Sequence, residues 1–106
     1  MWTEPKNIVK IGFPSKPYRE GQTIADIFVC ISYTTGLPLF YRVQTYDIKS
    51  RHHNFISFEE AVIFCDLHDY WIDTSDWSDY RIGLNKFYVT CNSIDLENGT
   101  KLKIDD

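Results

Sequence analysis

The stretch IADIFVCISYT, residues 24–34, decides the fold of this chain. In an extended backbone Ile27 and Val29 face one way, whereas Phe28 and Cys30 face the other. Because both faces are largely apolar, the pattern predicts a central strand of a β-sheet.

The residues that follow predict a hairpin. Thr35-Gly36 is a turn, and Pro38 stands at the start of the next strand, where a missing N–H group is tolerated. Apolar and polar side chains then alternate up to Tyr46, which is typical of a half-buried strand paired with its predecessor. Residues 7–13 alternate in the same way and predict an earlier strand, whereas the polar, basic residues 49–54 predict a loop.

A helix is predicted next. Ser57 and Glu60 match a capping box, in which the Ser57 hydroxyl accepts a hydrogen bond from the Glu60 N–H group. The run AVIFCDLHDYW contains neither Gly nor Pro, so we predict a helix over residues 58–71. Near the C-terminus, a three-residue loop at 97–99 with Gly99 in the left-handed region keeps the apolar residues of a final hairpin on one face.

Together these elements predict an α+β fold in the order β-β-β-α-β-β-β. We expect an antiparallel sheet of about five to six strands with the one main helix, residues 58–71, packed on one face. The chain has 106 residues, 43% of them hydrophobic and 25% charged, which is typical of a globular protein. Residues 1–106 are therefore predicted to form a single compact domain.

Charge is unevenly distributed. Residues 1–55 carry seven Lys and Arg against four acidic residues, a net of +3, whereas residues 56–106 carry four against eleven, a net of −7. An acidic surface disfavours direct binding to a nucleic-acid backbone and favours cationic partners.

Cysteine use indicates the compartment. Cys30, Cys65 and Cys91 are odd in number, widely spaced and set among apolar residues, so we expect reduced thiols in the core. The sequence contains neither an apolar leader nor an apolar run of membrane-spanning length. These observations favour a cytoplasmic protein that does not contact a membrane.

The most biased segment is DLHDYWIDTSDWSDYR, residues 66–81. In a continuous helix one exposed row would contain Asp66, Asp69, Asp73 and Asp76, and the opposite side would contain Ile63, Phe64, Leu67 and Trp71. Residues 73–76 are typical cap and turn residues, so we expect the helix to break there. The candidate partner-binding residues are the acidic and aromatic side chains of this segment: Asp66, Asp69, Asp73, Asp76, Trp77, Asp79 and Tyr80.

Three interpretations of this segment compete. A solvated helix face followed by a polar loop is the usual origin of a charge run. A protein-binding surface would use Tyr and Trp for contact and the carboxylates to steer a basic partner. A metal site is disfavoured, because the segment lacks the D-x-D-x-D spacing and the central Gly of a calcium loop. We expect no metal, no cofactor and no catalytic residue.

The predicted function is binding by a small acidic module. It would block a basic partner, such as a nucleic-acid-handling protein, by electrostatic and steric occlusion, in analogy of charge with nuclease inhibitors, immunity proteins and anti-CRISPR proteins. One alternative is a small hydrolase or nuclease that uses His68 with Asp66 or Asp69; His52 and His53 lack metal-site spacing. Another is a subunit of a larger assembly, which includes a homo-oligomer.

Overall fold

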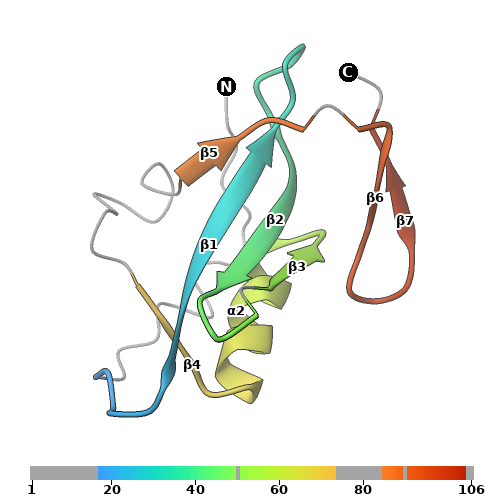
Figure 1. The fold of residues 1–106 in the computed structure, drawn as a ribbon. Helices are drawn as coiled ribbons and strands as arrows, with labels where there is room; N and C mark the ends of the chain where they lie inside the picture. The colour runs from blue at the N-terminus through green and yellow to red at the C-terminus, as the bar shows by residue number, and fades with distance from the viewer. Residues whose placement is uncertain (1–16, 50, 74–84, 90, 105–106) are drawn as a thin grey trace.

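The structure is a computed structural model, and it describes residues 17–49, 51–73, 85–89 and 91–104. Within these residues the fold is α+β, as predicted, with one helix and seven strands in two sheets (Figure 1). The elements follow one another as β1 (Thr23–Ile31), β2 (Pro38–Thr45), β3 (His52–Phe55), α2 (Phe58–Leu67), β4 (Tyr70–Ile72), β5 (Asn85–Phe87), β6 (Ser93–Asp95) and β7 (Lys101–Lys103). The predicted strand at residues 7–13 lies outside the described residues.

Strand β1 is central, as its two apolar faces predict. It pairs with β2 in an antiparallel hairpin, and β3 extends the sheet beyond β2. On its other edge β1 pairs in parallel with β4 near its start and with β5 near its end. The expectation of a purely antiparallel sheet is therefore only partly met, because α2 carries the chain from β3 across the sheet to the far edge of β1. A helical crossover of this kind produces parallel strands.

The first hairpin closes as predicted. Gly36 adopts a φ of +72°, and the Ser32 hydroxyl accepts hydrogen bonds from the N–H groups of Thr34 and Thr35, both at 3.1 Å. The predicted loop at residues 49–54 is wrong in its second half, because His52–Phe55 is strand β3. The polar side chains of this segment favour a loop in the sequence, but polar residues are also typical of edge strands.

Helix α2 begins as predicted, with the Ser57 hydroxyl 3.1 Å from the Glu60 N atom that donates to it. It ends at Leu67 instead of residue 71, and Asp69 follows with a left-handed φ of +56°. Asp69 stands four residues after the buried Cys65, so a continued helix would turn its carboxylate toward the core. Trp71 consequently lies on strand β4, paired with Ile24 of β1.

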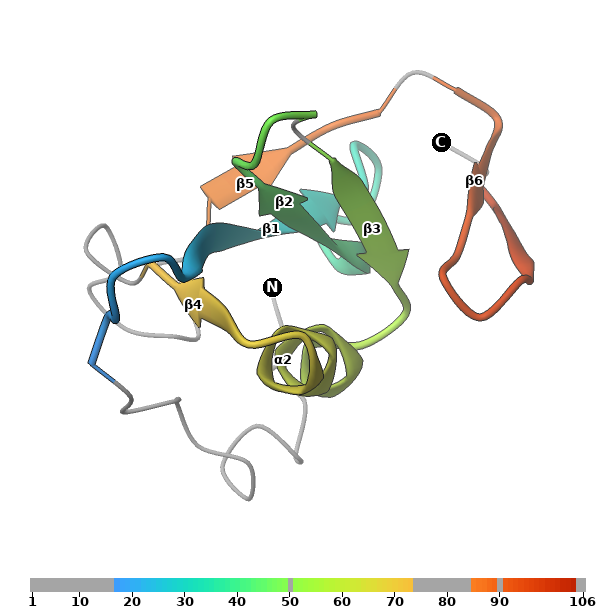
Figure 2. The same ribbon diagram turned by 60° about the horizontal axis from the view of Figure 1, so that its bottom comes forward.

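Two hydrophobic clusters cover the two faces of the sheet. Helix α2 packs on one face, as predicted, and Figure 2 shows it end-on beneath the strands. The buried residues of this face are Ala25, Ile27, Val29, Ile31, Tyr41, Val43, Phe55, Phe58, Ala61, Val62, Cys65 and Ile72. On the other face Cys30, Phe40 and Ile104 form the centre of the second cluster, which the β6–β7 hairpin covers.

The β6–β7 hairpin has the predicted bulged loop. Asp95 pairs with Lys101, and the Leu96 N–H group donates to the Thr100 carbonyl oxygen at 2.8 Å. Gly99 has a φ of +91°, the left-handed conformation that this loop requires. The loop is tied to β3, because the Glu97 N–H group donates to the Asn54 carbonyl oxygen at 2.8 Å. This bond holds the hairpin turn beside α2.

Candidate functional site

The described aspartates of this segment, which a continuous helix would align in one row, lie on different elements. Asp66 is exposed on α2, and Asp69 is exposed in the turn after it. Asp73 is half-buried beyond β4, where its N–H group donates to the Ala25 carbonyl oxygen at 2.9 Å. A continuous helical row of carboxylates through Asp73 is therefore wrong. The remaining candidates, which are Asp76, Trp77, Asp79 and Tyr80, lie outside the described residues.

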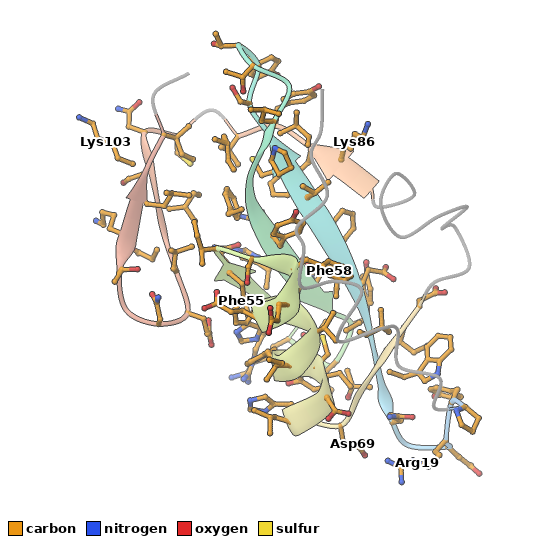
Figure 3. The ribbon with its side chains drawn as sticks, turned by 180° about the vertical axis from the view of Figure 1, so that it is seen from behind. Arg19, Phe55, Phe58, Asp69, Lys86 and Lys103 are labelled. Atoms are coloured by element: carbon orange, nitrogen blue, oxygen red, sulfur yellow. The ribbon has the colours of Figure 1, made fainter. Side chains whose placement is uncertain are left out.

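Asp69 is engaged within the chain. Its carboxylate forms an ion pair with the Arg19 guanidinium and accepts a hydrogen bond from the Gln22 amide at 3.3 Å. Figure 3 shows Arg19 and Asp69 side by side at the end of α2. Since a carboxylate near a helix C-terminus opposes the helix dipole, Arg19 compensates a charge that the turn places unfavourably. Asp69 thus has a structural role at this turn.

A groove lies between α2 and the turn of the β6–β7 hairpin. Its volume is about 300 Å³. The two elements flank the end of β3 in Figure 2, and the bond between Glu97 and Asn54 ties the hairpin turn to β3. The lining residues are Asn54, Phe55, Ile56, Glu60, Ile63, Phe64, Leu67, Leu96, Glu97 and Asn98.

Helix α2 exposes apolar side chains to this groove. Its core side consists of Phe58, Ala61, Val62 and Cys65, at the spacing of one helical face. Ile63 is nevertheless 45% exposed and Leu67 77% exposed, although both were expected on the side opposite the solvated carboxylates. A helix with apolar residues on both sides is normally covered on both sides. The outer side of α2 therefore has the character of an interface.

The charged lining of the groove is acidic. Among the residues that the structure describes, Glu60 and Glu97 are the only charged ones that line it. The sequence contains no Lys or Arg from His52 to Tyr80, but seven acidic residues. Figure 3 places Lys86 and Lys103 far from Asp69, at the other end of the molecule. A cationic ligand would thus meet attraction on this side.

Aromatic rings connect the elements behind the groove. The Phe64 ring centroid lies 4.7 Å from that of His53 and 4.3 Å from that of His68. His68 in turn stacks on Tyr70 of β4. The Nδ1 atom of His53 lies 3.0 Å from a carboxylate oxygen of Glu97, so β3, α2, β4 and the hairpin turn are held together.

The hydrolase alternative receives little help from these contacts. The His68 ring contacts those of Phe64 and Tyr70, while Asp69, one of its two expected partners, is bound to Arg19. Burial, with the charges of Arg42 and His53, lowers the pKa of His52. Within the described residues, no group of three His, Cys, Asp or Glu side chains could hold a metal ion.

The cysteines differ from one another in burial. Cys30 and Cys65 are buried, as predicted, whereas Cys91 is exposed and its prediction as a core thiol is wrong. Burial raises the pKa of the Cys65 thiol to about 12. Because the thiolate is the nucleophile, Cys65 is inert at neutral pH. None of the three cysteines forms a disulfide in the described residues.

Comparisons with protein-family models, with curated proteins and with solved structures found no match for this chain. Across the part of the chain that the structure describes, no helix has the length and apolar character needed to span a membrane.

The groove is the feature that sequence reasoning missed. Its walls come from segments about thirty residues apart, so their proximity has no local signature. One signal was present: α2 carries Ile63, Phe64 and Leu67 in addition to a complete core side at Phe58, Ala61, Val62 and Cys65. That surplus indicates a second covered face.

Proposed function

We propose that this chain is a small binding module that recognises a basic protein partner and blocks it by occupying its surface. The observation that carries the proposal is the outer side of α2. There, exposed Ile63 and Leu67 line a groove whose charged lining residues, within the described part of the chain, are Glu60 and Glu97. Apolar area supplies affinity on contact, and carboxylates select and steer a cationic partner.

The acidic segment belongs to the same proposal. Asp66 adds an exposed carboxylate on α2, and Asp73, Asp76 and Asp79 extend the negative charge along the sequence. Trp77 and Tyr80 remain candidate contact residues, since aromatic side chains are enriched among the residues that dominate interfaces. Asp69 contributes less, because its charge is compensated by Arg19. A partner that handles nucleic acid would fit, since its own ligand is also anionic.

We also propose a cytoplasmic location and an inhibitory, immunity-type role without chemistry. Three cysteines without a disulfide among the described residues, two of them buried, favour a reducing compartment. Occlusion needs only a surface that competes for the basic site of the partner. The role is distinguished from that of a subunit in a larger assembly by its dependence on salt, because steering by exposed charges weakens as ionic strength rises.

The test is a matched pair of charge-neutralised variants. Glu60→Gln with Asp66→Asn removes two charges on α2, and Glu20→Gln with Asp47→Asn removes two exposed charges outside the groove lining. Proteins captured by the wild-type chain from its native cell are identified, and their association rates are measured over a salt series. We expect the α2 pair to slow association with a basic partner on the order of tenfold at low salt and to flatten its salt dependence.

The control pair should leave both the rate and the salt slope close to those of the wild-type chain. Equal rates and slopes for both variants would contradict the proposal, as would capture of a partner with an acidic binding surface.

A further inference from the structure

We propose that the groove between α2 and the β6–β7 turn receives an amphipathic helical segment of the basic partner. Its apolar stripe would pack on Ile63 and Leu67, and flanking Lys or Arg residues would meet Glu60 and Glu97. This inference rests on the proposed function, and it adds the place of contact and the form of the segment that binds.

The size of the groove limits what enters it. A volume of about 300 Å³ lies at the lower end of ligand-binding pockets. It takes apolar side chains and leaves the backbone of the partner outside. Phe55 and Phe64, in contact at 5.0 Å between ring centroids, lie at the buried side of the groove and are held in the core. The groove is therefore preformed, and binding does not have to order it.

The exposed side chains favour a helix as the occupant. Ile63 and Leu67 stand one helical turn apart, so they form a ridge along the surface of α2. Helical ligands read such surfaces through apolar residues at positions i, i+4 and i+7, whose ridges pack between those of the facing helix.

An added strand is the less suitable occupant. Strand addition needs a free sheet edge, and the nearest edge is that of β3. The Asn54 carbonyl oxygen of β3 already accepts from the Glu97 N–H group at 2.8 Å, and the Asn54 side-chain amide donates to the Asp95 carbonyl oxygen at 3.2 Å. The hairpin turn thus occupies the site where another strand would pair.

The charges of the groove exclude a second copy of α2 as the occupant. Glu60 and Glu97 stand on opposite walls, on the helix and on the hairpin turn. Helix α2 contains Glu59, Glu60 and Asp66 and no basic residue, so two copies facing each other would bring like charges together. A basic segment neutralises both walls.

The test uses three synthetic peptides of about 14 residues, roughly four helical turns. The first carries Leu at i, i+4 and i+7 with Lys on its flanks, the second is a scrambled sequence of the same composition, and the third replaces each Lys by Glu. Each is titrated into the isotopically labelled chain, and amide chemical shifts are followed by NMR. We expect only the first peptide to shift the amides of Ile56, Ile63, Leu67 and Leu96.

Two variants of the chain locate the contact. Leu67→Ser removes the most exposed apolar side chain of the groove, and Ile48→Ser removes a still more exposed apolar side chain from the β2–β3 loop, outside the groove lining. We expect Leu67→Ser to weaken the dissociation constant of the first peptide on the order of tenfold and Ile48→Ser to leave it unchanged. Thermal melts of both variants check that neither is unfolded.

The outcomes separate the two proposals. If the two basic peptides bind equally and the groove amides do not move, the groove assignment is overturned while the acidic binding function stands. If the Glu peptide binds the groove as tightly as the Lys peptide, selection for a basic partner is contradicted and an apolar groove remains. Absence of groove shifts with every peptide at millimolar concentration overturns the groove assignment.

Discussion

Helix α2 carries apolar residues on two sides, and they are buried on one side but exposed on the other. On the core side Phe58, Ala61, Val62 and Cys65 are buried against the sheet, where each contributes to folding. On the outer side Ile63 and Leu67 are exposed, and the carboxylates of Glu60 and Asp66 stand near them in the sequence. Folding accounts for the first set alone. The second set has a cost in water without a gain in the isolated chain, and the binding that we propose would offset that cost.

The largest expected effect is the loss of stability when a buried side chain on the core side of α2 is truncated. Phe58→Ala should lower the free energy of unfolding by about 3–5 kcal/mol, because the side chain is 1% exposed and its removal leaves a cavity. Urea denaturation followed by fluorescence measures the loss. A matched exchange on the outer side, Leu67→Ala, should cost less than about 0.5 kcal/mol. Equal losses for the two variants would remove the contrast between the sides.

The next effect is the pH dependence of stability that the buried Cys65 thiol gives to the core side of α2. Burial raises the pKa of Cys65 to about 12 from the ordinary value of 9.0. Between these values the unfolded chain loses the proton that the folded chain keeps, so this contribution is complete below pH 9 and is lost as the pH rises toward 12.

Cys65→Ala provides the comparison for this titration. Urea midpoints measured at about pH 8 and about pH 10.5 should fall more for the wild-type chain than for the variant. The exposed Cys91 is present in both proteins and cancels. Parallel behaviour of the two proteins would mean that Cys65 is solvated.

The smallest effect is the change in stability when the ion pair at the C-terminal end of α2 is removed. Arg19→Ala removes the ion pair with Asp69. Both side chains of this pair are more than half exposed. We expect a loss of less than about 1 kcal/mol in the free energy of unfolding. Asp69→Asn, which keeps a residue suited to the left-handed backbone, is the companion variant. A loss above about 2 kcal/mol would show that the pair, more than the β4 pairing, terminates α2.

The parts of the fold that follow from local chemistry were predictable. Ser57 caps the helix and Gly99 closes the bulged hairpin because a few neighbouring residues decide each conformation. The central position of β1 followed from its two apolar faces. Each of these features is set within about ten residues of the chain.

The parts that failed depend on distant segments. The local sequence predicts helix at residues 70–72. They form a strand because they pair with Thr23–Ala25 and because a continued helix would turn Asp69 toward the core. His52–Phe55 reads as loop, and only pairing with β2 makes it a strand. Leu67 and Leu96 both line the groove, and no local sequence pattern links residues so far apart along the chain. Tertiary pairing overrides propensity at these positions.

The most direct test of the contrast between the two sides combines stability and binding in one variant, Ile63→Ser with Leu67→Ser. We predict a midpoint of thermal unfolding within a few degrees of the wild-type value, since both side chains are already exposed, together with loss of the partner at physiological salt. A large fall in the melting temperature with unchanged partner binding would contradict the account, because the outer side of α2 would then serve folding and not recognition.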